Sequence, residues 1–180
     1  MKKSQKIVIT GGPGSGKTSL INALHQKGYT IFPEVSRLLI KTALENGVEN
    51  YFEEKPLEFS ATLLKERKAQ YNAANESNDS LIFIDRGLPD VFAYLAANKI
   101  PHNFDTAILT NHPYDHIIFL PPWKEIYQRD RERFESFTMA EQLGEKLFQF
   151  YSQLGYSPIT IPPAPLTDRC ELVINAIVDG

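Results

Sequence analysis

A glycine-rich segment near the start of the chain has the residue types that bind phosphate groups. In IVITGGPGSGKTSL (7–20), four apolar or β-branched residues run into GGPGSGKT, a complete match to the pattern GxxxxGK(S/T). Glycines let backbone N–H groups turn inward around a phosphate, and a following helix N-terminus adds partial positive charge. We predict that Lys17 neutralises the β- and γ-phosphates of a nucleotide and that the Thr18 hydroxyl binds Mg²⁺. The predicted nucleotide-binding residues are Gly12, Pro13, Gly14, Ser15, Gly16, Lys17, Thr18 and Ser19.

Three further candidates directly follow predicted strands. In FPEVSR (32–37), Glu34 could accept a proton from a substrate hydroxyl, or it could simply be a helix-start glutamate stabilised by the helix dipole. In LIFIDRG (81–87), four apolar residues end at Asp85, where a carboxylate can hold Mg²⁺ directly or through water. Arg86 could bind a phosphate or a substrate oxygen, the alternative being a salt-bridged surface pair of Asp85 and Arg86.

An arginine-rich run, YQRDRERFES (127–136), alternates Arg129, Arg131 and Arg133 with acidic residues. Such runs commonly form solvated helix faces. Because this one follows the fourth predicted strand and precedes a capped helix, we predict a lid over about residues 122–137 that closes on the phosphates. Arg133 is the predicted catalytic arginine, since it lies nearest the expected hinge before Thr138, and Arg129 is predicted to bind the nucleotide.

The elements that must position these residues can be read from the apolar pattern. Five short runs, KIVIT (6–10), YTIF (29–32), SLIFI (80–84), HIIFL (116–120) and PITI (158–161), are typical of strands buried on both faces of a parallel sheet. Helical patterns follow the glycines at 17–27 and recur at 34–46 and 57–76, the last with Leu57, Ala61, Leu64 and Tyr71 at helical spacing. Pro89 suits the first turn of another helix, and TMAE (138–141) reads as a capping box. Alternating strands and helices predict an α/β fold.

Composition narrows the class of protein. The 180 residues are 42% hydrophobic and 23% charged, which is ordinary globular usage and favours a single domain over 1–180. A net charge of −3 makes nucleic-acid binding through a basic surface an unfavourable hypothesis. The single cysteine, Cys170, is expected to be a buried apolar residue. No run is long enough for a membrane helix or a signal sequence, so we expect a cytoplasmic protein of unassigned oligomeric state.

The stretches GGPGSGKT, PEVSR, DRG and RDRERFES together resemble the P-loop nucleoside and nucleotide kinases. Within that group the chain is most similar to the small single-domain AAA-type ATPase and kinase-like family, which is also similar to the ribosylnicotinamide kinase domain. The resemblance implies a three-layer P-loop sandwich with five parallel strands in the order 2-3-1-4-5. It also implies that Glu34 is a general base, as in deoxynucleoside kinases, whose Glu-Arg-Ser after the third strand is here Asp85-Arg86-Gly87.

The leading functional hypothesis is an ATP-dependent kinase of a small nucleoside- or nucleotide-like molecule. ATP is favoured over GTP because TNHPYD (110–115) lacks the lysine and spaced aspartate of a guanine-reading motif. The alternative is a nucleotide-dependent switch or ATPase that controls a partner. A kinase needs an open acceptor pocket between Glu34, Arg86 and the helices at 57–76 and 88–98, with Phe59, Tyr71, Phe92 and Tyr94 as candidate stacking residues. No function is predicted for the acidic segment 46–56.

Overall fold

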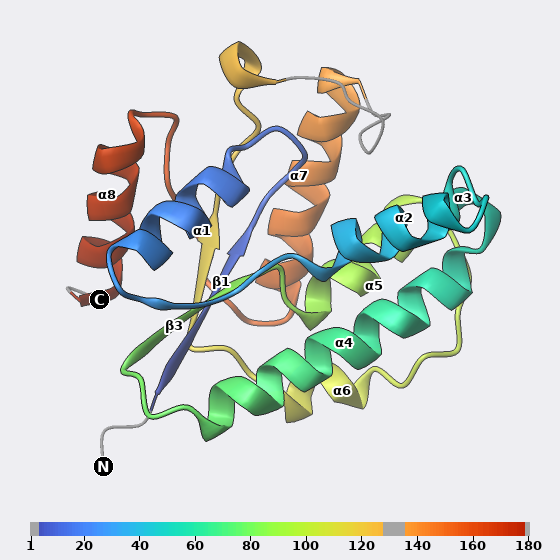
Figure 1. Cartoon of the computed structure of the whole chain (residues 1–180), viewed down its shortest axis with the longest axis horizontal. Coiled ribbons are helices and arrows are strands. Elements are labelled where there is room, and N and C mark those ends of the chain that lie inside the picture. Colours follow the sequence, from blue (N-terminus) through green and yellow to red (C-terminus); the bar gives the residue numbers. More distant parts are fainter. Residues whose placement is uncertain (1–3, 128–135, 179–180) are drawn as a thin grey trace.

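Five parallel strands form the sheet, in the order β2-β3-β1-β4-β5 (Figure 1). The computed structural model describes residues 4–127 and 136–178, with strands β1 (Gln5–Thr10), β2 (Thr30–Phe32), β3 (Leu81–Asp85), β4 (His116–Phe119) and β5 (Ile159–Thr160). The predicted strands are thus confirmed to within one residue at each end. The strand order is the one that the family resemblance implied.

Helices cover both faces of the sheet, which explains why the strands do not alternate polar with apolar residues. On one face, α1 (Lys17–Gln26) and α8 (Leu166–Val178) pack on side chains such as Ile9 and Phe83. On the other, α4 (Pro56–Glu76) and α7 (Phe137–Gln153) pack on Val8, Ile82 and Ile84. Successive residues of β1 therefore enter opposite layers of the core.

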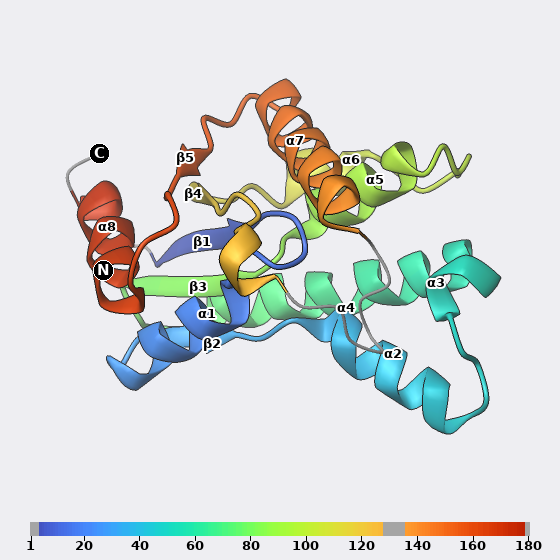
Figure 2. The same ribbon diagram turned by 90° about the horizontal axis from the view of Figure 1, so that it is seen from above.

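The described chain contains further helices outside these two layers. They are α2 (Val35–Glu45), α3 (Tyr51–Glu54), α5 (Leu88–Ala97) and α6 (Ala107–Asn111), with a short 3-10 helix, η1 (Lys124–Ile126), after β4. Of these, α6 packs against α5 before the start of β4. Figure 2 shows α2, α3 and the start of α4 beyond the ends of β1 and β3, while η1 and the start of α7 lie beside the loop between β1 and α1. Residues 1–3, 128–135 and 179–180 lie outside the described part of the chain.

Two sequence predictions were wrong in detail. The α7 helix begins at Phe137 rather than within TMAE, because the Ser136 hydroxyl accepts a hydrogen bond from the Met139 N–H at 3.2 Å and caps the helix two residues earlier. On α4, Leu57 and Ala61 are exposed, and the buried stripe runs instead through Phe59, Leu63, Arg67, Tyr71 and Ala74. That stripe places the charged residue Arg67 on the buried face of α4.

Cys170 is buried in α8 within the core, as expected, and burial raises the pKa of its thiol. Within the described ranges, no helix is long and apolar enough to cross a membrane.

We expect Leu24→Ala to lower the free energy of unfolding by about 2–5 kcal/mol, because Leu24 is fully buried between α1 and the sheet and its truncation leaves a cavity. The exposed Leu38 on α2 is the matched control, and its replacement by alanine should change stability by no more than about 0.5 kcal/mol. Urea unfolding of both variants measures the difference. Equal changes in the two variants would contradict the assignment of this core.

Candidate functional site

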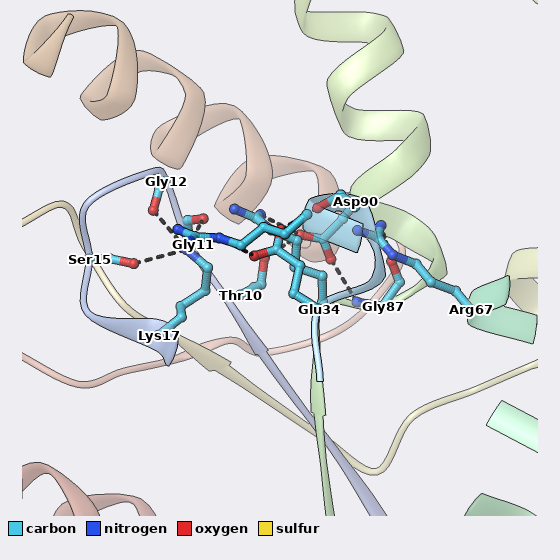
Figure 3. Close-up of polar contacts among 12 residues, drawn as sticks. Thr10, Gly11, Gly12, Ser15, Lys17, Glu34, Arg67, Gly87 and Asp90 are labelled. Atoms are coloured by element: carbon cyan, nitrogen blue, oxygen red, sulfur yellow. Dashed lines mark hydrogen bonds and ion pairs between the residues drawn. The ribbon is translucent and has the colours of Figure 1, made fainter. Parts of the chain in front are cut away.

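The glycine-rich loop joins β1 to α1 at the carboxyl edge of the sheet, where parallel α/β folds bind ligands. Lys17 is buried inside this loop, and its Nζ donates hydrogen bonds to the carbonyls of Gly11 at 3.1 Å and Gly12 at 2.9 Å and to the Ser15 hydroxyl at 3.1 Å (Figure 3). Thr18 and Ser19 are exposed at the start of α1. The loop therefore has the strand-loop-helix setting that the phosphate-binding prediction requires.

Burial is the main cause that lowers the pKa of Lys17 to about 7, and the nearby Arg86 cation lowers it further. The carboxylates of Glu34, Asp85 and Asp90 act in the opposite direction. A phosphate placed in the loop would add negative charge and favour the protonated amine. Lys17 thus lies within electrostatic reach of every acidic candidate in the site.

Arg86 is the centre of the site. Its guanidinium is almost fully buried, and its Nε donates to Glu34 Oε1 at 2.9 Å while its Nη1 donates to Asp90 Oδ1 at 3.1 Å. The same guanidinium lies 5.4 Å from the centre of the Tyr94 ring. Glu34 follows β2 and Arg86 follows β3, and the sheet brings them to the same edge. Both were predicted from the sequence to lie beside the acceptor site, but their direct pairing was not predicted.

Asp90 was missed by the sequence analysis. It is fully buried and accepts hydrogen bonds from the Thr10 hydroxyl at 2.6 Å, the Tyr151 hydroxyl at 2.6 Å and the Gly87 N–H at 2.9 Å, besides that from Arg86 (Figure 3). These contacts join β1, α5 and α7 around one carboxylate. Helical i,i+4 spacing could not have identified the pair, because Arg86 lies before the start of α5 with φ at +70°.

The two predicted acids have opposite electrostatics. Burial raises the pKa of Glu34, but the charge of Arg86, then that of Lys17 and the Ser36 hydrogen bond at 2.6 Å, outweigh it and bring the value to about 2. Burial, then repulsion from Glu34, raises the pKa of Asp85 to about 6. Glu34 is thus ionised at neutral pH. Asp85, whose pKa is higher, takes up a proton more readily as the pH falls.

The backbone at Arg86 is strained, with φ at +70°, a conformation that non-glycine residues rarely adopt. Its N–H donates to the Ile9 carbonyl at 3.1 Å, which ties this turn to β1. At the next residue, a Cβ atom would lie 2.8 Å from the Tyr151 hydroxyl and 3.0 Å from the Tyr114 ring. A side chain at position 87 would therefore require the buried Tyr151 hydroxyl, which donates to Asp90, to shift.

An open cavity of about 770 Å³ runs from the glycine-rich loop past Glu34 and Arg86 to α3, α4 and α7. Phe59 and Tyr94 line it, as predicted for stacking residues. Phe92 and Tyr71 instead belong to the buried core, the more common place for aromatic residues at helical spacing. The space that a small acceptor would need is therefore present.

Two further parts of the cavity wall were not predicted. Arg67, on the buried stripe of α4, donates to the Gly87 carbonyl at 3.0 Å, and its charge on an apolar face was the available signal. The acidic segment 46–56 contains α3, whose Tyr51 and Phe52 form an aromatic end wall with Phe59. No local pattern in that segment indicates a pocket wall, because α4 supplies its packing partner.

Part of the predicted lid lies within the described residues. Ile126, just after β4, and Met139, in the first turn of α7, line the cavity next to the loop, and the Tyr127 and Phe137 rings lie 5.4 Å apart. Arg129, Arg131 and Arg133 lie outside the described residues, so their roles stay predictions.

The residues present fit a hard cation such as Mg²⁺. Asp85 Oδ1 is buried without a hydrogen-bond partner in the part of the chain that is described, and Thr18 presents an exposed hydroxyl at the start of α1. Over the same residues, no three His, Cys, Asp or Glu side chains gather into a metal centre. A carboxylate and a hydroxyl are oxygen ligands of the kind that such a cation takes, together with phosphates and water.

Comparison with known proteins identifies the fold. A family model described as AAA domain matches residues 6–169. Among curated protein sequences, none matches this chain. The structure of deoxyadenosine kinase from M. mycoides with bound dATP superposes with a TM-score of 0.69 at 20% identity, covering 97% of this chain and 100% of that one.

A second solved structure, that of the NadR protein in complex with NAD and AMP-PNP, gives a TM-score of 0.70 at 15% identity. It covers 98% of this chain, which spans 49% of the NadR chain. At such low identity these likenesses establish the fold alone. They confirm the predicted P-loop kinase-like sandwich with its five-stranded parallel sheet.

We expect Arg86→Met to raise the pKa of Glu34 from about 2, because the largest charge that opposes the effect of burial is removed. Titration of the Glu34 side-chain carboxyl signal by NMR measures the change. Arg37→Met is the matched control and should shift the pKa less, since Arg37 is half-exposed and its Nε lies 3.7 Å from Glu34 Oε2. An unchanged Glu34 pKa in Arg86→Met would contradict this account.

Proposed function

We propose that this chain, which belongs to the AAA domain family, transfers the γ-phosphoryl group of ATP to a hydroxyl of a small nucleoside- or nucleotide-like molecule. The observation that carries the proposal is the single open cavity that joins the phosphate-binding loop to the Glu34–Arg86 pair. Phosphoryl transfer works mainly by positioning and charge stabilisation, so a donor site and an acceptor site must share one enclosed space.

The donor end would bind the triphosphate through residues 12–19. In this proposal Lys17 leaves the loop carbonyls to pair with the β- and γ-phosphates, while Thr18 and Asp85 hold Mg²⁺. The metal would supply charge neutralisation at the transferring phosphate. Arg129 and Arg133 are proposed to add positive charge from the lid segment.

The acceptor end would bind a hydroxyl beside Glu34. Arg86 and Ser36 donate hydrogen bonds to Oε1, whereas among the described residues Oε2 has only the longer ion pair with Arg37, at 3.7 Å. Oε2 is therefore the oxygen proposed to accept a hydrogen bond from the incoming hydroxyl. Arg86 holds Glu34 ionised and in place, and it can itself donate to an acceptor oxygen. Phe59 and Tyr94 offer apolar faces for a ring-bearing acceptor.

The fold relatives support this substrate class. One is a deoxyadenosine kinase with dATP bound, and the other is in complex with NAD and AMP-PNP. Both ligand sets contain a nucleotide with a chain of phosphates. The open acceptor cavity favours a kinase over a nucleotide-dependent switch, because a switch or ATPase needs only room for water beside the γ-phosphate.

Thermal-shift screening of nucleosides and nucleotides against the protein with Mg²⁺–AMP-PNP tests the proposal. A ligand held at 100 times its dissociation constant should add about 2.7 kcal/mol to the free energy of unfolding. We expect stabilisation by the nucleotide alone and a further shift with the matching acceptor. Stabilisation by nucleotide with no acceptor effect across the panel would favour the switch or ATPase.

We expect Glu34→Gln to lower phosphoryl transfer to the identified acceptor on the order of 10²–10⁴-fold while ATP binding stays intact. Steady-state transfer rates and nucleotide titrations separate the two effects. Lys17→Ala is the comparison variant, and it should abolish turnover because the phosphates lose their buried cation. Full activity in Lys17→Ala, or an unchanged rate in Glu34→Gln, would refute the assigned roles.

A further inference from the structure

Arg169, on the helix α8, contacts the glycine-rich loop. This arginine lies in the first turns of the helix and is buried, and its Nη2 donates to the Ser15 carbonyl at 2.9 Å although 154 residues separate the two. No carboxylate among the described residues pairs with this guanidinium. Keeping an unpaired cation away from water is costly, so the contact with the loop needs a functional explanation.

The neighbouring carbonyl of the loop is also held from outside. The Trp123 N–H, in the segment after β4, donates to the Gly14 carbonyl at 3.2 Å. The Trp123 ring in turn lies 5.9 Å from the Arg169 guanidinium carbon. Arg169 and Trp123 therefore act together on two consecutive peptide groups of the loop.

Holding these carbonyls outward determines where the amides point. In a planar trans peptide the C=O and N–H groups point in opposite directions. When Arg169 and Trp123 bind the Ser15 and Gly14 carbonyls from outside, the N–H groups of Gly16 and Ser15 turn into the loop. Neither N–H has an acceptor in the part of the chain that is described. Consecutive inward N–H groups form the kind of concavity that binds anions.

Close packing keeps this arrangement in place. Gly16 has φ at +79°, and a Cβ atom there would lie 2.7 Å from Arg169 Nη1. The glycine thus allows both the left-handed backbone and the approach of the guanidinium. Ser15 is fully buried, so the loop has little room to rotate its peptides while Arg169 remains.

We propose that Arg169 is a positioning residue that orients the peptide N–H groups of the glycine-rich loop toward the phosphates of the nucleotide. The inference rests on the proposed function, because it takes that loop to be the phosphate site. Arg169 donates to the loop but does not line the cavity in which the nucleotide and the acceptor are proposed to bind. Its removal should therefore weaken every polyphosphate ligand by the same factor.

Calorimetric titration of Arg169→Gln with Mg²⁺–AMP-PNP and with Mg²⁺–tripolyphosphate tests the proposal. We expect the dissociation constants of both ligands to rise by about tenfold, which corresponds to the loss of one hydrogen bond. The lost bond is the one from Arg169 to the Ser15 carbonyl, which orients the N–H donors of the loop. In the kinase assay, KM for ATP should rise while KM for the acceptor is unchanged. Val173→Ala is the matched control, since it weakens the packing of α8 without touching the loop and should leave both constants unchanged.

The outcomes separate this inference from the proposed function. Wild-type protein that binds both ligands, with Arg169→Gln binding them equally well, overturns the role of Arg169 alone. A loss confined to AMP-PNP also overturns it, because Arg169 would then act on the nucleoside. Wild-type protein that binds neither ligand overturns the proposed function and this inference with it. If Arg169→Gln does not fold, Arg169→Met decides, because methionine fills similar space but cannot donate to the Ser15 carbonyl: an equal loss for both ligands supports the role, and unchanged affinities refute it.

Discussion

The buried guanidinium of Arg86 is shared by two carboxylates, and the arrangement of the site depends on this interaction. Glu34 follows β2 and Asp90 lies on α5, so the cation links two elements that the sheet brings to the same edge. Asp90 extends the link to β1 through Thr10 and to α7 through Tyr151. Removing one partner from such a buried cluster leaves an uncompensated charge, which costs about 3–5 kcal/mol.

The same cluster sets the chemistry of its members. Arg86 outweighs the effect of burial on Glu34 and keeps that side chain ionised, whereas Asp85, which lacks a hydrogen bond to Oδ1 within the described residues, has a raised pKa. One carboxylate is therefore ready to accept a hydrogen bond, and the other is ready to take a cation. Two acids on neighbouring strands acquire different properties because only one of them pairs directly with the arginine.

The glycine-rich loop is held by parts of the chain that lie far from it in sequence. Lys17 binds the carbonyls of Gly11 and Gly12 from within, while Trp123 and Arg169 bind those of Gly14 and Ser15 from outside. Its flexible glycines thus adopt one conformation because their carbonyls have partners on both sides. Residues after β4 and in α8 are as much a part of the loop geometry as the motif itself.

The sequence by itself determined the strands, the position of the loop and the placement of Glu34 and Arg86 just after β2 and β3, because apolar runs and strand-end residues are local signals. That these two side chains pair was decided by the tertiary structure. The parallel sheet then brings strand ends to one edge whatever lies between them. Only the tertiary structure decided the partners of Asp90, the place of Arg67 and α3 in the cavity wall, and the contact of Arg169 with the loop. These contacts join residues from helices whose facing surfaces depend on packing, and packing is a property of the whole chain rather than of any short stretch.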